Sequence, residues 1–423
     1  MKQGPSEQRF LGFELKLREL VFRAAARVVE PVMQALADQF DASFQPSPTQ
    51  RLVERRPLGV TGLFGLVQIR RDYYLDDNRG HCPADAALGL ENAYTPALAR
   101  MLCRSAAQNS YREASEDLFE YAGVKVCDRQ IQRLVQTVAP AVGPWLKTQQ
   151  SKPEIALMYV SPDGTGVPMR KEVLVGRKGK QPDGSAKTQE AKLGCVFLQT
   201  EVDPEGHPVR QEDSTSYIGS FEGAVEFGLL LRQEAQRRGM AQATKLIVLG
   251  DGAAWVWELA RVNFPGAILI LDFYHAVQHL HALVEALCGK DTAEGKKRLK
   301  VWKGWLLKDK ASRVIEQAKA EVARSLDKEK AEKEIAYLQN NVERMSYGTF
   351  RRAGYFIGSG VVEAGCKIVI GKRMKCSGMF WSEEGGQGIL DLRCAFLSDR
   401  LDAFWHDRAN THAARNDALK FAA

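Results

Sequence analysis

The chain has 423 residues with 45% hydrophobic and 26% charged side chains, a composition typical of soluble globular proteins, and its length predicts at least two domains. No apolar run is long enough to span a membrane and residues 1–20 lack the features of a secretory signal, so we expect a cytoplasmic protein. The eight cysteines form no CxxC pair, which argues against disulfides and against a cysteine zinc site. The formal net charge of +7 is compatible with a nucleic-acid partner and does not by itself establish one.

Residues 1–95 are predicted to be helical first and β-rich afterwards. Apolar residues recur at helical spacing between residues 13 and 40, and β-prone segments punctuated by glycine follow between residues 53 and 75. We expect a helical N-terminal region followed by a small β unit.

Residues 96–150 contain a predicted helix-turn-helix. Ser110 and Glu113 form an S-x-x-E capping box at the start of a helix that Gly123 ends, and Asp128 is placed to cap a second helix. The second helix turns polar side chains outward, and those predicted to bind DNA are Arg129, Gln130 and Arg133. Structural helical hairpins have the same pattern; we favour the DNA-binding interpretation.

Residues 151–289 alternate between strands and helices in the order βββαβαβα. The first strand ends at Asp163, and the segments 173–176 and 191–200 are predicted to form the next two strands. The remaining elements are a helix over 221–238, a strand ending at Asp251, a helix near 253–262, the strand of AILILD and a helix from about His275. This order is typical of the ribonuclease H-like α/β fold, in which the carboxylates at the strand ends gather at one edge of a mixed sheet.

A helical insertion is predicted between this first part of the core and its final part. Residues 290–350 are charged, lack proline and keep helical spacing, whereas residues 351–400 return to the core and contain Glu363. The insertion would be a helical subdomain packed on the core or a contact to DNA or a second subunit. Its best candidate DNA face consists of basic and aromatic residues: Lys296, Lys297, Arg298, Lys300, Lys303, Trp302 and Trp305. Residues 401–423 form a polar tail to which we assign no function.

Three carboxylates are the candidate catalytic and metal-binding residues: Asp163 in SPDGTG, Asp251 in LGDGAAW and Glu363 in GSGVVEAG. Oxygen ligands of this kind suit two Mg²⁺ or Mn²⁺ ions, which in phosphoryl transfer serve the attacking and leaving oxygens on opposite sides of one phosphorus. Asp163, on the central strand, is the predicted bridging ligand, and the other two would each complete one ion's shell. There are competing interpretations. Asp163 and Asp251 could be ordinary turn residues, and Glu363 could simply stand in the first turn of a helix. Glu343 and Asp272 are the alternatives for the third carboxylate.

A basic stretch follows Glu363 without an intervening acid. Between Ala364 and Trp381 the cationic residues are Lys367, Lys372, Arg373 and Lys375. Beside a carboxylate site we predict that they contact the DNA backbone, the alternative being a solvated helix face.

Three histidines on one predicted helix invite a zinc-site interpretation: His275, His279 and His281. No glutamate stands beside them as a metallohydrolase would need. We favour a structural role, or for His275 a position behind the metal ligands.

Five ordered segments, YVSPDGTGVPM, EAKLGCVF, VLGDGAAWVW, DFYHA and GSGVVEAGCKIVIGKRMKCSGMFW, together resemble the transposases of the ISKra family of bacterial insertion sequences, relatives of the Mutator-type DDE enzymes. The resemblance covers roughly residues 80–405. It implies a DDE catalytic triad of Asp163, Asp251 and Glu363. It also implies that Asp272 and His275 are the DxxH pair found between the second and third members. The cysteine-rich segment common in the family is reduced here to His81 and Cys82, so we expect no zinc knuckle.

The resulting prediction is a DDE transposase that binds the terminal inverted repeats of its element, hydrolyses a strand at each end and transfers the 3'-hydroxyl into target DNA. Because two ends must be held together, we expect a homodimer or larger assembly, nucleoid-associated when bound to DNA and without a membrane partner. Two alternatives stay open: a nuclease of the same fold that does not join strands, and a catalytically silent DNA-binding protein derived from a transposase.

Overall fold

The computed structural model describes residues 5–76, 79–148, 157–177, 179, 181 and 186–409, and divides the chain into two compact units. Unit 1 combines Met1–Trp145 with Asp399–Ala423, and unit 2 is Leu146–Ser398. The segments 1–95 and 96–150 of the sequence analysis thus share one unit up to Trp145. Within the described part of the chain, no helix is both long and apolar enough to cross a membrane.

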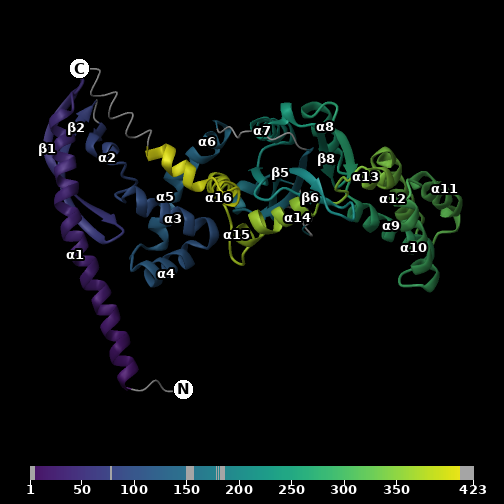
Figure 1. Ribbon diagram of the computed structural model, residues 1–423, viewed down its shortest axis with the longest axis horizontal. Helices are drawn as coiled ribbons and strands as arrows, with labels where there is room; N and C mark the ends of the chain where they lie inside the picture. Colours follow the sequence, from purple (N-terminus) through teal and green to yellow (C-terminus); the bar gives the residue numbers. More distant parts are fainter. Residues whose placement is uncertain are drawn as a thin grey trace. The chain divides into compact units, whose positions relative to one another are not determined.

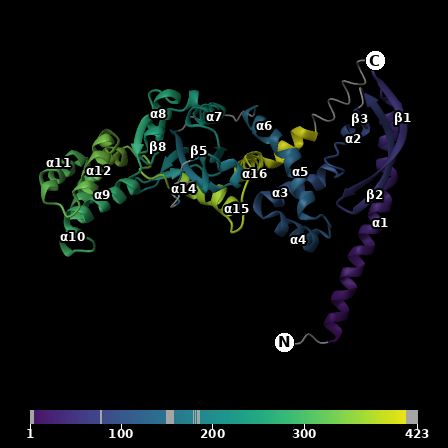
Figure 2. The same cartoon turned by 180° about the vertical axis from the view of Figure 1, so that it is seen from behind.

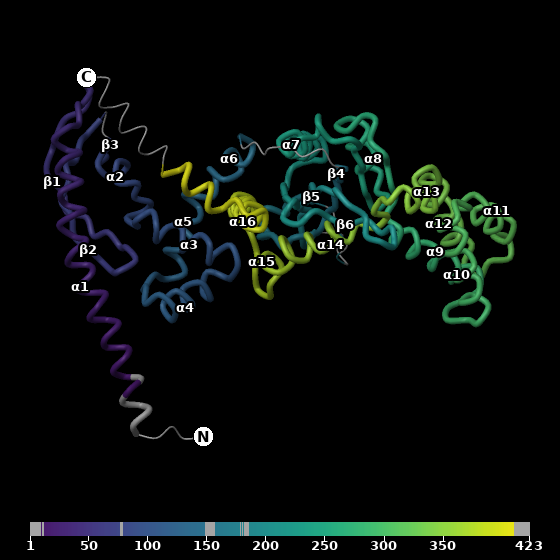
Figure 3. Tube along the Cα trace, in the orientation of Figure 1, coloured from purple at the N-terminus to yellow at the C-terminus, as the bar shows by residue number. Residues whose placement is uncertain are grey.

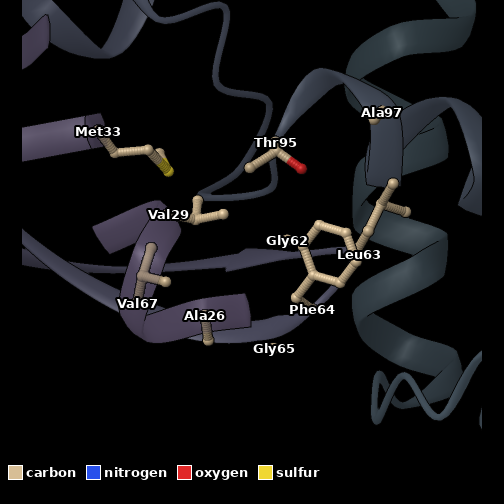
Figure 4. A pocket seen from close by; sticks show the side chains of 10 residues that line it. All are labelled: Ala26, Val29, Met33, Gly62, Leu63, Phe64, Gly65, Val67, Thr95 and Ala97. Atoms are coloured by element: carbon tan, nitrogen blue, oxygen red, sulfur yellow. The ribbon is translucent and has the colours of Figure 1, made fainter. Parts of the chain in front are cut away.

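Unit 1 begins with a long helix that packs on a three-stranded antiparallel sheet (Figure 3). These elements are α1 (Pro5–Ser43), β1 (Gln50–Gly62), β2 (Gly65–Asp76) and β3 (Arg79–His81). Met33 of α1 forms a small core with Val60, Val67 and Ile69 of the sheet. Beside this core lies a cavity of about 140 Å³, and its ten lining residues carry no charge (Figure 4).

The middle of unit 1 is helical: α2 (Pro83–Ala87), α3 (Pro96–Gln108), α4 (Tyr111–Ala122) and α5 (Asp128–Val138). The capping box of Ser110 is formed, and Gly123 ends α4 with a left-handed φ of 68°, as the sequence predicts. The prediction that Asp128 caps α5 is wrong, because Cys127 is the N-cap and its N–H donates to Gln130 Oε1 at 3.1 Å. Helix α6 (Val142–Thr148) follows a 3-10 turn, Ala139–Ala141.

The segment predicted to be a polar tail contains a helix over residues 401–409 that belongs to unit 1. Leu401, Phe404 and Trp405 recur at helical spacing and are buried. Asp402 pairs with Arg100 at 2.8 Å. The tail is therefore part of the folded unit as far as residue 409.

Unit 2 is built on a six-stranded mixed sheet in the order β6-β5-β4-β8-β9, with β7 also paired to β5. Its strands are β4 (Leu157–Pro168), β5 (Thr188–Val202), β6 (Pro208–Arg210), β7 (Ser216–Ser220), β8 (Lys245–Gly250) and β9 (Ile268–Leu271). Strand β4 is antiparallel to β5 and parallel to β8, and β8 is parallel to β9.

One predicted strand is wrong: Lys171–Leu174 is a short 3-10 helix and residues 175–176 form a turn. A four-residue apolar run does not distinguish a strand from a turn. The third strand of the series is β7 instead. Its Gly219 packs against Leu390 of α16 (Glu383–Leu397), which covers this strand.

Helices cover both faces of the sheet (Figures 1 and 2). On one face, α7 (Ala224–Arg237) and α8 (Ala254–Asn263) enclose a core with Val160 and Val248 of the sheet. On the other face, α9 (Phe273–Cys288) packs over Tyr159 and Leu249.

The insertion is helical, as predicted, with α10 (Ala293–Leu306), α11 (Ala311–Glu321), α12 (Lys328–Asn340) and α13 (Tyr347–Arg352). It packs on α9 and extends the same core. Trp302, predicted to be part of a DNA face, is 2% exposed in this core, and Arg298 is paired with Glu294 and Glu321. Packing, rather than DNA contact, explains these two residues.

Candidate active site

Two of the predicted carboxylates lie at the same level on adjacent strands. Strands β4 and β8 run parallel with Val160 beside Val248, and Asp163 and Asp251 each stand three residues farther along the chain. The valine pair faces α7 and α8. Because side chains alternate between the two faces of a strand, an odd number of steps directs Asp163 toward the side of α9. Asp251 lies just beyond β8, and its charge acts on His275 of α9.

A third aspartate, Asp272, follows β9 at the same level as Asp251. Its side chain caps α9 by accepting a hydrogen bond from the His275 backbone N–H at 2.7 Å, and it lies 3.2 Å from His275 Nδ1. The other carboxylate oxygen accepts from the backbone N–H of Ser359. Burial acts to raise the pKa of Asp272, yet the hydrogen bonds from His275 and Ser359 outweigh burial and hold that pKa below its usual value. Since both oxygens are engaged within the protein, Asp272 is a poor rival for the third metal ligand.

Glu363 joins the same network from the first turn of α14 (Gly360–Gly365). Ser359 Oγ lies 3.3 Å from Glu363 Oε1, and His275 Nδ1 lies 3.7 Å from the same oxygen. The Glu363 side chain is 36% exposed and so remains open to a ligand. The pKa of His275 is raised, first by its hydrogen bond to Asp272 and then by the charges of Asp272, Asp251 and Glu363. The imidazole therefore links the carboxylates of β8, β9 and α14 electrostatically.

Asp163 lies in a setting that disfavours its charge. Burial raises the pKa of its carboxyl, and the charge of Asp251 raises it further. Hydrogen bonds from the Cys366 thiol and from the Gly164 N–H, the latter at 2.7 Å, act in the opposite direction. Cys366 directly follows α14, so this thiol connects Asp163 to the helix that carries Glu363.

The helical insertion contacts the turn that carries Asp251. Tyr337 of α12 donates its hydroxyl to the main-chain oxygen of Asp251 at 2.6 Å, and its ring stacks on that of His279 with centroids 3.5 Å apart. Gly252 has a φ of 96°, and a Cβ at this position would collide with the Tyr337 hydroxyl. Glycine in the LGDG segment is therefore required by both backbone and packing. Sequence analysis missed Tyr337, because one tyrosine on a helix carries no distinctive pattern.

The three histidines face three different carboxylates. His275 contacts Asp272, His279 Nδ1 lies 2.5 Å from Glu334 Oε2, and His281 Nδ1 lies 3.8 Å from an oxygen of Glu285 in the same helix. The structure does not bring the three imidazoles together, which favours the structural interpretation over zinc.

Three of the four predicted DNA-contacting cations after Glu363 are exposed: Lys367, Lys372 and Lys375. Lys375 Nζ donates to Thr165 Oγ1, two residues beyond Asp163 on β4. This ammonium group therefore lies beside the strand that carries Asp163, and its contact with DNA stays a prediction.

For Arg373 the prediction of DNA contact is wrong. The side chain is 1% exposed, and its guanidinium carbon lies 5.1 Å from the centre of the Trp381 ring. Residues Cys366–Gly371 form a π-helix, which changes the direction of the following side chains relative to a continuous α-helix. Buried Arg393 of α16 donates to the main-chain oxygen of Val369 in that π-helix. These two arginines stabilise the segment after Glu363 from within.

The carboxylates fit divalent metal ions in ligand type. In the described part of the chain, two sets of three potential ligand atoms lie within 4.8 Å of one another: Asp203, Glu205 and His207, and Asp272, His275 and Glu363. The first set lies on a surface turn, and in the second set Asp272 is already occupied by hydrogen bonds. Asp163, Asp251 and Glu363 offer the oxygen donors that Mg²⁺ and Mn²⁺ prefer. The raised pKa of Asp163 fits a site that a cation completes.

The predicted DNA-reading residues lie on the exposed side of α5 in unit 1: Arg129, Gln130 and Arg133. Ile131 and Leu134 are buried on the opposite side of the helix. Gln130 and Arg133 also line a shallow, polar depression next to Tyr94. Contact of these residues with DNA stays a prediction.

Comparisons with known proteins gave distant similarities. No protein-family model matches the chain. A UPF0236 protein in the vanSb 3' region of Streptococcus gallolyticus is 25% identical over 360 residues, which cover 82% of this chain and 74% of that protein. Among solved structures, the Drosophila P element transposase strand transfer complex is similar at 9% identity, over 74% of this chain and 80% of that chain, with a TM-score of 0.28. A TM-score this low does not establish a common fold, so the function must be inferred from the site itself.

Proposed function

We propose that the protein is a DDE transposase with a ribonuclease H-like core, which cuts DNA at the ends of a mobile element and joins the exposed 3'-hydroxyl to target DNA. The arrangement of the carboxylates carries the proposal. Asp163 and Asp251 stand at the same level on adjacent parallel strands, and the charges of both Asp251 and Glu363 act to raise the pKa of His275. The sheet, in which β7, β5 and β4 are antiparallel and β8 and β9 are added in parallel, supports the ribonuclease H-like assignment.

In this proposal Asp163 would bridge two Mg²⁺ or Mn²⁺ ions, and Asp251 and Glu363 would each complete the shell of one ion. When bound, such ions activate an oxygen nucleophile and stabilise the leaving oxygen of an in-line displacement at phosphorus. Hydrolysis and strand transfer then differ only in the nucleophile, water in the first case and a DNA 3'-hydroxyl in the second.

The protein's own groups fix where the carboxylates stand. Tyr337 holds the main chain of Asp251, and Ser359 Oγ contacts the carboxylate of Glu363. Lys375, bonded to Thr165, supplies a positive charge beside the site for a phosphate of the DNA backbone.

The test uses the full chain, Mg²⁺ or Mn²⁺ and a labelled duplex that carries the element's own end and a target duplex. Asp163→Asn, Asp251→Asn and Glu363→Gln should bind the duplex without cutting it. Asp203→Asn, in the surface set of potential ligands, is the matched control and should cut like the wild type. Cutting without joining would favour the nuclease, and binding without cutting by the wild type would favour the DNA-binding protein. Normal cutting by Glu363→Gln would require a different third carboxylate.

A further inference from the structure

Helix α1 carries a continuous apolar stripe on its outer side. Six large side chains of this stripe are 48–67% exposed: Phe10, Phe13, Leu17, Leu20, Val21 and Val28. Steps of three, four and seven residues keep them on one side of an α-helix. The side that packs on the sheet, marked by buried Met33, points about 180° away at 100° per residue.

A stripe of this kind differs from the scattered apolar residues of an ordinary surface. From Phe10 to Val28 it is about 27 Å long at 1.5 Å per residue. Within that length Glu14 stands at one edge, and charged residues such as Lys16 and Arg23 fall outside the stripe. Figures 1 and 3 show the N-terminal half of α1 extending beyond β1 and β2; apart from Arg18 and Phe22, which contact the end of α4 at Glu120 and Gly123, little of the described chain packs on this half. A helix in water depends on such packing for most of its stability.

We propose that α1 pairs along this stripe with α1 of a second copy of the chain. An uncharged apolar surface is complementary to itself, which is the condition for an interface in which both subunits use the same patch. The six side chains expose roughly 600 Å² per copy, so a pair that covered them fully would bury at most about 1,200 Å², the lower end of specific protein interfaces. Pairing does not depend on catalysis, but it would supply the two-subunit assembly that the proposed transposase needs to hold two DNA ends.

The test measures the mass of the full chain in solution by sedimentation equilibrium across a range of concentrations, with a monomer mass of 47.1 kDa. The wild type should be a dimer at micromolar concentration. Leu20→Lys, which places two ammonium groups in each interface, should weaken the dimer at least about 100-fold. Leu229→Lys is the matched control: this leucine is 53% exposed on α7 of unit 2, and its substitution should leave the dimer unchanged.

Two further variants keep the test decisive. Val28→Lys repeats the charge insertion eight residues farther along the stripe, in case Leu20→Lys perturbs the helix itself, which far-UV circular dichroism would reveal. Glu363→Gln should remain a dimer whatever its effect on DNA cutting, so failure of the pairing and failure of the proposed chemistry are distinguishable.

Four results would overturn the pairing. They are a wild type that stays monomeric at tens of micromolar concentration, a dimer that survives both Leu20→Lys and Val28→Lys, and a dimer that Leu229→Lys weakens equally. The fourth is a monomeric wild type that floats with phosphatidylcholine and phosphatidylglycerol vesicles while Leu20→Lys does not, which would assign the stripe to a lipid surface.

Discussion

Replacing Asp272 by asparagine should destabilise unit 2 although the side chain keeps its size. The carboxylate is fully buried and accepts hydrogen bonds from the backbone N–H groups of His275 and Ser359. An amide has one accepting oxygen and one donating nitrogen, so at least one of these N–H groups would face another donor. An unsatisfied buried donor costs about 1–3 kcal/mol, whereas the N-cap itself is kept, because asparagine caps a helix about as well as aspartate. We expect a loss of about 1–3 kcal/mol in the free energy of unfolding.

The same substitution at Asp163 should have no effect or a slightly stabilising one in the absence of divalent ions. Burial and the charge of Asp251 raise the pKa of Asp163, which means that the fold disfavours its charged form. A neutral amide removes that unfavourable charge. Two aspartates of the same sheet, on β4 and directly after β9, are thus predicted to respond differently to one chemical change.

Thermal unfolding of the full chain in EDTA, followed by differential scanning calorimetry, distinguishes the two variants. For a unit of this size 1 kcal/mol corresponds to about 2–4 °C, so Asp272→Asn should lower the transition of unit 2 by about 2–12 °C. The reasoning is refuted if Asp272→Asn melts with the wild type, or if Asp163→Asn melts as low as Asp272→Asn.

Three further predictions concern groups around the carboxylates. Tyr337→Phe removes the hydroxyl that donates to the main-chain oxygen of Asp251, and it should slow DNA cutting about 10-fold. The affinity for DNA, measured by gel shift, should be unchanged. Cutting at the wild-type rate would contradict a positioning role. Arg373→Gln should lower the melting temperature because the guanidinium is buried, whereas Lys375→Gln should leave it unchanged and weaken DNA binding in a salt-dependent way. The hydrogen bond to Asp272 raises the pKa of the His275 imidazole. The stability that this ion pair contributes is therefore complete below pH 6.5 and is lost as the pH rises through the higher pKa of the folded state. Melting temperatures measured across this pH range should fall in the wild type and not in His275→Gln.

Local patterns were sufficient to predict most elements of the sheet and the level at which Asp163 and Asp251 stand. Each aspartate follows an apolar strand-forming run and precedes a glycine, but the prediction that the first strand ends at Asp163 is wrong, because β4 continues to Pro168. Strand β7 escaped prediction because its outer side is covered by α16, which removes the usual alternation of polar and apolar residues. The inward direction of the Arg373 side chain depends on the preceding π-helix. The hydrogen bond from the Tyr337 hydroxyl to the main-chain oxygen of Asp251 joins segments that lie far apart in the chain. Such features follow from tertiary packing, which a local pattern does not contain.

The acids of the candidate site differ in whether the protein compensates their charge: it does so for Asp272 and not for Asp163 or Glu363. Asp272 has its charge compensated by donors of the protein itself and is predicted to affect chemistry through Ser359 and His275, which each lie against both Asp272 and Glu363. Asp163 carries a charge that its surroundings disfavour, and Glu363 is partly exposed. A fold that keeps uncompensated carboxylates near one another gives up stability there, and a bound divalent cation is the simplest source of the missing charge. Adding Mg²⁺ or Mn²⁺ should therefore raise the melting temperature of unit 2 in the wild type and much less in Asp163→Asn, even in the absence of DNA.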